Sequence, residues 1–480
     1  MTKILRYGTL FAIATLFSRF TGLMRDVFLA NRFGVGIEFD AYSIAIAFPF
    51  LLRRAFAEGA MTSAFIPLYK EKADKNEFAS AVITSLGIAT ISLTILVQIF
   101  PQIVPFLLSS GANTETKLLA AKLARVSTPF IVFIFLWAVL YAIQNSSERF
   151  FFPALSPMFM NFGIIAGVIL CELFDPRILG PTIGFTLGGA AMFLSLIPGA
   201  KRVGFSYRPT FVGARDFFKL FFPALLTMTV SEFNVLIDVN VAALIGPGSV
   251  SILQYANRFY QLPFGIFGVA VSTVALPLMS GEDEDSSKHL KDAMRTTFFF
   301  SVPSTIGLIV LSERLIVLVY QHGAFTHSDS IRTATALLFY SLGLPFYSMM
   351  ALLSRSCHAK KDMKLPFKAT VVSFVSNAVL DFVLGLTMKT AGVALATALA
   401  GAIGAGYLFF KLRPEIDMKH FQKVLICSAL MGLVLMIAEH VSTSKLFTLV
   451  LVLLGVGVYM VSCLITKVDE AYQLLHFIRK

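Results

Sequence analysis

The chain has 480 residues, of which 56% are hydrophobic and only 14% are charged. A typical soluble domain is about 25% charged, so the composition excludes a soluble globular enzyme, a disordered chain and a disulfide scaffold. It indicates an all-α polytopic membrane protein with enough apolar residues for fourteen spanning helices of about 20 residues each.

Fourteen apolar segments, separated by polar, Gly or Pro breaks, are predicted to be these helices. The first apolar run ends at Ser18-Arg19 without a small-residue cleavage site, so we expect it to remain as a helix and not to act as a cleaved signal. In chain order, the predicted helices are 5–31, 40–68, 78–100, 118–143, 153–174, 178–200, 217–245, 250–279, 296–320, 332–357, 366–388, 391–411, 420–439 and 446–466.

Basic residues are concentrated in alternate loops of this arrangement. The net charge is +12, and cytoplasmic loops of membrane proteins carry an excess of Lys and Arg. Placing the N-terminus inside puts the basic clusters, such as 201–219, in inner loops. We therefore predict that both chain termini are cytoplasmic. The outer loops then hold only Arg32, Lys117, Arg177, Arg332, Lys389 and Lys445.

The two halves of the chain resemble each other at a nearly constant offset. Because the offset covers six helices, an even number, both copies have the same orientation in the membrane, which is typical of transporters with parallel repeats. We predict a lobe of helices 1–6 (1–212), a lobe of helices 7–12 (213–413), an additional helix pair (414–466) and a cytoplasmic amphipathic tail (467–480). The matching motifs are Ser110-Gly111-Ala112 with His322-Gly323-Ala324, Pro129-Phe130 with Pro345-Phe346, and Asn161 with Asn377.

Four arginines at the starts of the two halves lie inside predicted spans, where a charged side chain costs about 2.5–3.5 kcal/mol at the bilayer centre. Helix 1 carries Arg19 and Arg25, helix 2 carries Arg53 and helix 8 carries Arg258. Arg is suited to bidentate phosphate binding, so the four together predict a cationic cavity for a phosphate-bearing substrate. Snorkelling of the arginines to the membrane interface is the alternative.

Three polar residues accompany these arginines and are predicted to belong to the same site. Ser18 shares a helix face with Arg25, whereas Asp26 lies about 100° further round the helix. Glu58 follows Arg54 by four residues and is placed to form an ion pair with it. In a straight helix Arg19 and Arg25 point about 120° apart, and a bend at Gly22 is one way to bring both toward one cavity.

A second polar cluster is predicted in the C-terminal half. Asn377 and Asp381 are four residues apart on helix 11, Thr397 lies in helix 12 and Asp238 lies deep in helix 7. Carboxylate and neutral oxygens suit a hard monovalent cation such as Na⁺, or a proton relay. An interhelical hydrogen-bond network explains the same residues equally well, and both interpretations stay open.

The charged motifs resemble the MurJ (MviN) family of lipid II flippases, which belongs to the multidrug/oligosaccharidyl-lipid/polysaccharide (MOP) exporter superfamily. The resemblance extends over helices 1 to 12 and is densest at the start. The motifs that carry it are Ser-Arg-x-x-Gly-x-x-Arg-Asp at 18–26, Asp-Ala at 40–41, Leu-Arg-Arg-x-Phe-Ala-Glu-Gly-Ala at 52–60, Ala-Phe-Ile-Pro at 64–67, Tyr-Ala-x-Arg at 255–258 and Leu-Pro-x-Gly at 262–265.

This resemblance implies fourteen helices, in two six-helix lobes plus a terminal pair that forms a groove for the lipid tail. It implies that lipid II moves across the bacterial inner membrane and that Arg19, Arg25, Arg53 and Arg258 are essential. We expect a transporter and not an enzyme, driven by the membrane potential or an ion gradient. The expected partners are lipid II and membrane lipids, and no nucleic acid. We expect the protein to be a monomer without a cofactor, with Na⁺ as the candidate bound ion.

Three alternatives remain at this point. The first is a MOP-superfamily exporter of another polyprenyl-pyrophosphate-linked oligosaccharide. The second is a drug exporter, for which acidic and aromatic cavity residues are expected in place of four arginines. The third is a non-transporting scaffold, which needs neither an internal repeat nor buried charge.

Overall fold

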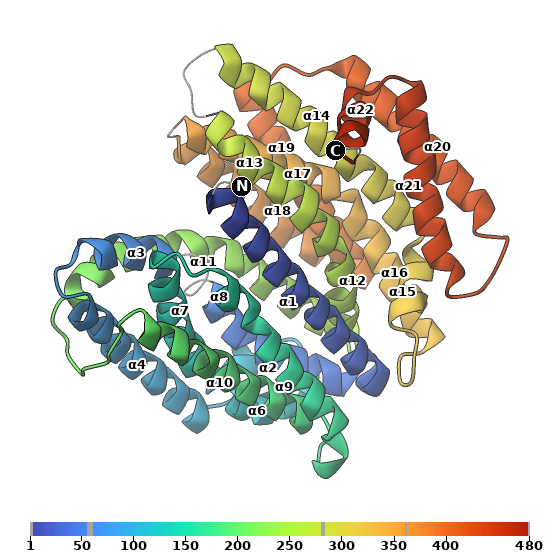
Figure 1. Cartoon of the computed structure of the whole chain (residues 1–480). Coiled ribbons are helices and arrows are strands. Elements are labelled where there is room, and N and C mark those ends of the chain that lie inside the picture. The colour runs from blue at the N-terminus through green and yellow to red at the C-terminus, as the bar shows by residue number, and fades with distance from the viewer. Residues whose placement is uncertain (1–2, 55–60, 280–283, 361, 479–480) are drawn as a thin grey trace. The chain divides into compact units, whose positions relative to one another are not determined.

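The computed structural model describes residues 3–54, 61–279, 284–360 and 362–478, and this part of the chain forms helices and no strand. The all-helical fold predicted from composition is therefore confirmed. The chain divides into two compact units, Met1–Ser251 and Ile252–Lys480, whose helices are drawn in Figure 1.

The first unit is built from long helices joined by short turns. Its final residues, 249–251, begin α12 (Ser249–Pro263). The other helices of the first unit are α1 (Lys3–Phe33), α2 (Ile37–Leu52), α3 (Met61–Glu71), α4 (Lys75–Ile99), α5 (Ile103–Leu108), α6 (Thr114–Ser127), α7 (Phe130–Ser146), α8 (Phe151–Leu155), α9 (Pro157–Ile169), the 3-10 turn η2 (Cys171–Leu173), α10 (Leu179–Arg202) and α11 (Ala214–Ile245).

The second unit continues α12 and ends in a short helix beyond the last predicted span. Its elements are the π-helix η3 (Phe264–Val269), α13 (Ala270–Leu278), α14 (Glu284–Val310), α15 (Ser312–Val319), α16 (His327–Leu342), α17 (Leu344–Ala359), α18 (Lys364–Met388), α19 (Thr390–Leu412), α20 (Met418–Ala438), α21 (Phe447–Ile465) and α22 (Asp469–Ile478).

Every predicted span coincides with a helix or with a helix broken in its course. Among the described residues, ten helices are long and apolar enough to cross a membrane, and the bent pair α6 and α7 raises this to eleven. These helices make the chain a multi-pass membrane protein. The count of fourteen crossings stays a prediction.

Two of the breaks occur at equivalent positions of the predicted repeat. The pair α6 and α7 bends by 42° at Thr128-Pro129, and α16 gives way to α17 at Gly343, two residues before Pro345. Proline lacks the backbone N–H that continues a helix, so the matched prolines account for the matched breaks. The short helices α5 and α15 also precede the matched Gly-Ala loops.

The second and eighth predicted spans contain π-helical turns. Residues 53 and 54 are π-helical at the end of α2, and Phe264–Val269 forms η3 immediately after Pro263. A π-turn inserts one extra residue per turn and often marks a functional site. The first of these turns contains Arg53, and the second begins six residues after Arg258.

Helix α11 packs against α3, α4 and α5 of the first unit. An ion pair at its start supports this packing, because Lys72 Nζ lies 2.7 Å from Asp216 Oδ2. The compact units consequently divide after Ser251, whereas the predicted repeat divides at 212/213. The compact units reflect packing, whereas the predicted lobes reflect internal sequence similarity, so the two boundaries need not coincide. The lobe boundaries stay a prediction.

Helices α9 and α10 lie side by side (Figure 1) and approach closely through glycines spaced four residues apart. A Cβ atom added to Gly163 would meet the Gly184 carbonyl oxygen at 2.4 Å, and one added to Gly167 would meet the Gly180 carbonyl oxygen at 2.2 Å. Such small residues let helix backbones meet inside a membrane. The contact fixes the position of α9, which carries Asn161.

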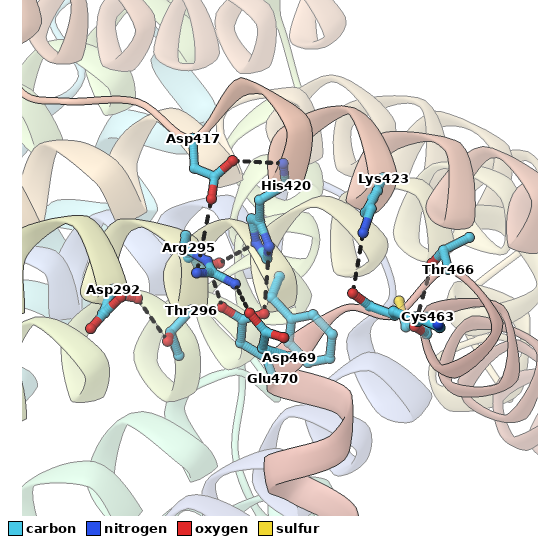
Figure 2. A network of polar contacts seen from close by, with 12 residues as sticks. Asp292, Arg295, Thr296, Asp417, His420, Lys423, Cys463, Thr466, Asp469 and Glu470 are labelled. Atoms are coloured by element: carbon cyan, nitrogen blue, oxygen red, sulfur yellow. Dashed lines mark hydrogen bonds and ion pairs between the residues drawn. The ribbon is translucent and has the colours of Figure 1, made fainter.

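A charged network attaches α22 to α14 and α20 (Figure 2). Arg295 Nη2 donates to Asp469 Oδ2 at 2.6 Å, and Arg295 Nε lies 3.2 Å from Glu470 Oε1. Asp417 Oδ2 lies 3.9 Å from Arg295 Nη1, and His420 Nδ1 lies 3.5 Å from Glu470 Oε2. The predicted amphipathic tail thus contains a helix that is docked on the protein.

The carboxylate of Asp417 makes part of this docking depend on pH. The backbone N–H of His420 and the charge of Arg295 lower the pKa of Asp417 below its ordinary value. Its stabilising contribution is therefore full above about pH 4, the unfolded-state value, and is lost as the pH falls through the lowered folded pKa. We expect the Tm difference between wild type and Asp417→Asn to be constant above about pH 5 and to shrink below about pH 4.

Thermal unfolding in detergent across this pH range checks the expectation. The control is Glu415→Gln, at a carboxylate whose side chain is 80% exposed, and it should change Tm little at any pH. If the Tm difference between wild type and Asp417→Asn persists unchanged down to about pH 3, the ionised carboxylate of Asp417 does not stabilise the docked α22.

Candidate functional site

Arg25 and Asp26 form a buried ion pair on α1. Arg25 Nε and Nη2 donate to Asp26 Oδ1 at 2.9 and 2.6 Å. The two side chains are only 7% and 8% exposed. Burying one charge without the other is costly, because each charge loses solvation that its partner helps to replace. The pair consequently holds the Arg25 guanidinium in a defined position.

Asn161 of α9 completes this network. Its Oδ1 accepts a hydrogen bond from Arg25 Nη1 at 3.0 Å, and its Nδ2 donates to Thr21 Oγ1 at 2.9 Å and to the Ser18 carbonyl oxygen at 3.2 Å. A Cβ at Gly22 would lie 3.6 Å from Nδ2, an ordinary van der Waals contact, so the amide packs against this position without requiring glycine. We call Arg25, Asp26, Asn161, Thr21 and Ser18 the α1–α9 network.

Arg19 lies outside the α1–α9 network. Helix α1 is continuous through Gly22, and Arg19 is exposed whereas Arg25 is 6% exposed. This agrees with the separation of about 120° that a regular helix gives these positions. Their convergence on one cavity stays a prediction.

Arg53 and Arg54 lie in the π-turn that follows α2. Arg53 is half-buried, with its guanidinium carbon 5.8 Å from the centre of the Phe50 ring, and Arg54 is exposed. This placement is within the range of a cation–π contact. Glu58, and with it the expected Arg54–Glu58 pair, lies outside the described residues.

Arg258 is half-buried on α12 in the second unit. Its helix is oriented by aromatic packing on neighbouring positions, because the Tyr255 ring lies 4.8 Å from Tyr320 and 5.4 Å from Phe325. Phe259 contacts Tyr320 as well, at 5.7 Å. The other three arginines belong to the first unit, and a cavity shared by all four stays a prediction.

Asp40 of α2 caps the first turn of α12. Its carboxylate is 3% exposed and accepts hydrogen bonds from the backbone N–H of Gly248 at 2.5 Å and of Ser251 at 2.8 Å, and from the Ser251 hydroxyl. Gly248 has a φ of 83°, a conformation that glycine adopts readily. A carboxylate at a helix N-terminus is favoured by both the exposed N–H groups and the helix dipole.

Loss of this cap should loosen the start of α12. Each hydrogen bond to a charged acceptor contributes about 1.5–3 kcal/mol, so we expect Asp40→Ala to increase hydrogen exchange at the Gly248 and Ser251 amides by about tenfold or more. Asp40→Asn keeps one acceptor oxygen, so its exchange rates at these amides should lie between those of the wild type and those of Asp40→Ala. Unchanged exchange at both amides in Asp40→Ala contradicts the capping role.

Two residues of the predicted cation site are joined on α18. Asn377 Nδ2 donates to Asp381 Oδ2 at 2.7 Å, and the residues are 2% and 0% exposed. Helix α19 packs against α18, and its Thr397 is half-buried and donates its hydroxyl hydrogen to the Val393 carbonyl oxygen at 3.1 Å. The Thr397 oxygen therefore keeps its lone pairs for a cation or a donor.

Asp238 is half-buried on α11, which belongs to the first unit, so its approach to Asp381 stays a prediction. Within the described ranges, no group of three or more His, Cys, Asp and Glu residues is placed to hold a metal ion. The Na⁺ or proton site at these residues stays a prediction.

Comparison with known families decides where this arrangement belongs. A family model described as "Lipid II flippase MurJ" matches residues 29–457, most of the chain. The chain belongs to the MurJ family. This confirms the resemblance predicted from the charged motifs, and members of the family are flippases, which are transporters and not enzymes.

Similar proteins match this MurJ family member along nearly their whole length. "Probable lipid II flippase MurJ" of Thermotoga maritima is 46% identical over 468 residues, covering 97% of each chain. "Lipid II flippase MurJ" of Thermosipho africanus is 44% identical over 461 residues, covering 96% of each chain.

Solved structures agree with this assignment. The structure titled "Lipid II flippase MurJ, inward closed conformation" is 44% identical, with a TM-score of 0.89, and the match covers 96% of this chain and 99% of that one. An inward-facing multidrug resistance MATE transporter of the MOP superfamily is 16% identical with a TM-score of 0.63. This match covers 82% of this chain and 94% of that one. The second likeness concerns the fold alone, and it fits the predicted superfamily.

Sequence reasoning assigned no role to two residues of this MurJ chain that the structure places in polar networks. Asn161 served only as a marker of the internal repeat, although it is the one polar side chain in α9. Asp40 served only as part of a family motif, although an acidic residue in an apolar helix is an expensive feature. In both cases the sequence shows the polar residue itself but does not show its partner.

Proposed function

We propose that this protein is a lipid II flippase that moves the lipid-linked peptidoglycan precursor from the inner to the outer leaflet of the bacterial cytoplasmic membrane. The observation that carries the proposal is the family match, which extends over residues 29–457 and includes relatives named for lipid II flipping. The same relatives favour lipid II over another polyprenyl-pyrophosphate-linked oligosaccharide. We further propose that the protein acts as a monomer, among membrane lipids, with both termini cytoplasmic.

The lipid pyrophosphate is bound by arginines in this proposal. Arg19, Arg25, Arg53 and Arg258 neutralise its charge, and Ser18, Asp26 and Glu58 belong to the same site. Arg25 supports the assignment, because Asp26 and Asn161 already hold its guanidinium in place. Pyrophosphate then competes with Asp26 for Arg25, so that substrate binding and opening of the ion pair are coupled. Alternating access carries the bound head group across the membrane.

The energy comes from the membrane potential or from an ion gradient. One charge that crosses the membrane gains about 2.3 kcal/mol per 100 mV, enough to bias a conformational equilibrium more than tenfold. We propose that Na⁺ or H⁺ binds at Asp238, Asn377, Asp381 and Thr397 and couples the gradient to the return of the empty protein. The buried Asn377–Asp381 pair supports this site.

Asp381→Asn should remove the dependence of flipping on Na⁺ or on pH, because it eliminates the buried carboxylate at the proposed ion site. The measurement is lipid II transport in proteoliposomes with an imposed Na⁺ or proton gradient. Asp329→Asn, which affects the exposed cap of α16, is the control and should keep the dependence. If Asp381→Asn transports with unchanged ion dependence, the cluster is a structural hydrogen-bond network.

Native mass spectrometry of the purified protein tests the substrate assignment. We expect a co-bound lipid of the mass of lipid II, and we expect Arg25→Gln to reduce its occupancy. A different polyprenyl-pyrophosphate saccharide on the wild-type protein contradicts lipid II as the substrate.

A further inference from the structure

The segment that joins α10 to α11 is held along the start of α4. Asn76 Nδ2 donates to the Gly204 carbonyl oxygen at 3.1 Å, and Asn76 Oδ1 accepts from the Ser206 N–H at 3.3 Å. Four residues further along α4, Ser80 Oγ accepts from the Arg208 N–H at 3.0 Å. We call residues 204–212 the α4 strap.

Tyr207 extends this attachment by one more helical turn. Its hydroxyl lies 3.0 Å from Thr84 Oγ1. The Thr84 hydroxyl donates to the Ser80 carbonyl oxygen at 2.8 Å, so the Tyr207 hydroxyl is the donor to Thr84. Since a helix rises about 1.5 Å per residue, Asn76 and Thr84 are about 12 Å apart along α4.

The α4 strap therefore runs from the start of a spanning helix toward the bilayer. Helix α4 is apolar enough to cross the membrane over Lys75–Ile99. The strap exposes large apolar side chains: Tyr207, beside Thr84, is 47% exposed, and Phe211 and Val212 are 63% and 62% exposed. Aromatic side chains with a polar group are typical of the level of the lipid head groups.

Basic residues flank these apolar residues in the sequence. Asp216 is the only acidic residue within 201–219, and it is paired with Lys72 at 2.7 Å. The Lys72 hydrogen bond and charge lower the pKa of Asp216, so this pair stays formed at neutral pH. The exposed basic side chains are Lys201, Arg202, Arg208, Arg215 and Lys219.

We propose that the α4 strap and its basic neighbours bind an anionic phospholipid of the bilayer, with Phe211 and Val212 among the acyl chains and Arg208 and Lys219 at the phosphate. Apolar burial and attraction to anionic head groups act together in such interfacial segments. The orientation proposed above places this site in the inner leaflet, whose anionic lipids attract basic segments. The binding itself rests on neither that orientation nor the transport activity.

Tryptophan fluorescence tests the site in the full-length chain. Phe211→Trp adds a reporter to the strap, and the unaltered chain, whose single tryptophan Trp137 is 5% exposed, gives the background. The protein is reconstituted into phosphatidylcholine vesicles that contain brominated phosphatidylglycerol or brominated phosphatidylcholine at equal mole fraction. Bromine quenches only a tryptophan that it contacts, so the signal reports the lipid beside residue 211.

We expect brominated phosphatidylglycerol to quench more than brominated phosphatidylcholine, since each basic residue near a membrane surface enriches anionic lipid about fivefold. Arg208→Gln with Lys219→Gln should remove this preference. Lys364→Gln with Lys368→Gln, at two exposed basic residues on α18, is the matched control and should keep it.

Three results would overturn the proposal: equal quenching by the two lipids, no quenching by either, and a preference that survives in the Arg208/Lys219 variant. Symmetric vesicles expose the strap to the same lipids in either orientation of the protein. Because no transport is measured, failure of this site and failure of lipid II flipping are distinguishable.

Discussion

Arg25→Gln should abolish lipid II flipping, with a loss of about 100-fold or more. Glutamine cannot supply the charge-assisted hydrogen bonds of the guanidinium, each of which contributes about 1.5–3 kcal/mol, and about 1.4 kcal/mol corresponds to a tenfold change. Flipping is measured as the appearance of lipid II in the outer leaflet of cells that express the variant at the wild-type level.

For Arg25→Gln, a loss of protein stability has to be distinguished from a loss of lipid II binding. Arg25→Gln leaves Asp26 buried without its counter-ion, which typically costs about 3–5 kcal/mol. The double variant Arg25→Gln with Asp26→Asn removes both charges and should recover most of the Tm without recovering transport. Normal flipping by the double variant at normal expression contradicts the proposed role of Arg25.

Gly184→Ala should prevent the close approach of α9 and α10 and reduce stability by about 3 kcal/mol or more. The added methyl group would lie 2.1 Å from the Gly163 carbonyl oxygen and 2.8 Å from its carbon. These are backbone atoms, so the helices must separate to accept it. Asn161 would then move away from Arg25 as well, and we expect a low yield of monodisperse protein with a reduced Tm.

The matched control is Gly87→Ala in the interior of α4. A Cβ there has no atom within 4 Å, and replacing glycine by alanine inside a helix typically stabilises it by about 0.5–1 kcal/mol. The two variants make the same chemical change with opposite expected signs. Equal Tm values for Gly184→Ala and Gly87→Ala would show that the helix contact does not require glycine.

Much of the fold could be predicted from the sequence because spanning helices are defined by local composition. Apolar length located the helices. Pro129 and Pro345 served only to align the repeat, and the breaks before α7 and α17 were not predicted, although proline removes a helical hydrogen bond wherever it lies. The π-helical turns at 53–54 and 264–269 were not predicted. Such turns depend on how neighbouring helices hydrogen-bond to the displaced backbone groups. The periodicity of apolar residues carries no information about these contacts.

The site was predictable as a set of residues but not as a set of contacts. Expensive charges within apolar helices pointed to Arg25 and Asp26, yet helical geometry alone placed their side chains on different faces. The long guanidinium spans that difference and pairs with its neighbour. Asn161 could not be assigned to Arg25 in advance, because one sequence does not indicate that α9 packs against α1.

In the proposed mechanism, this chain moves lipid II across the cytoplasmic membrane with Arg25 as a binding residue. The most direct measurement expresses it in bacteria depleted of their own lipid II flippase and labels the lipid II head group from outside with a membrane-impermeant reagent. We expect the wild-type chain to restore labelling and the double variant Arg25→Gln with Asp26→Asn not to restore it. A wild-type chain that reaches the membrane and leaves lipid II inaccessible from outside would contradict it.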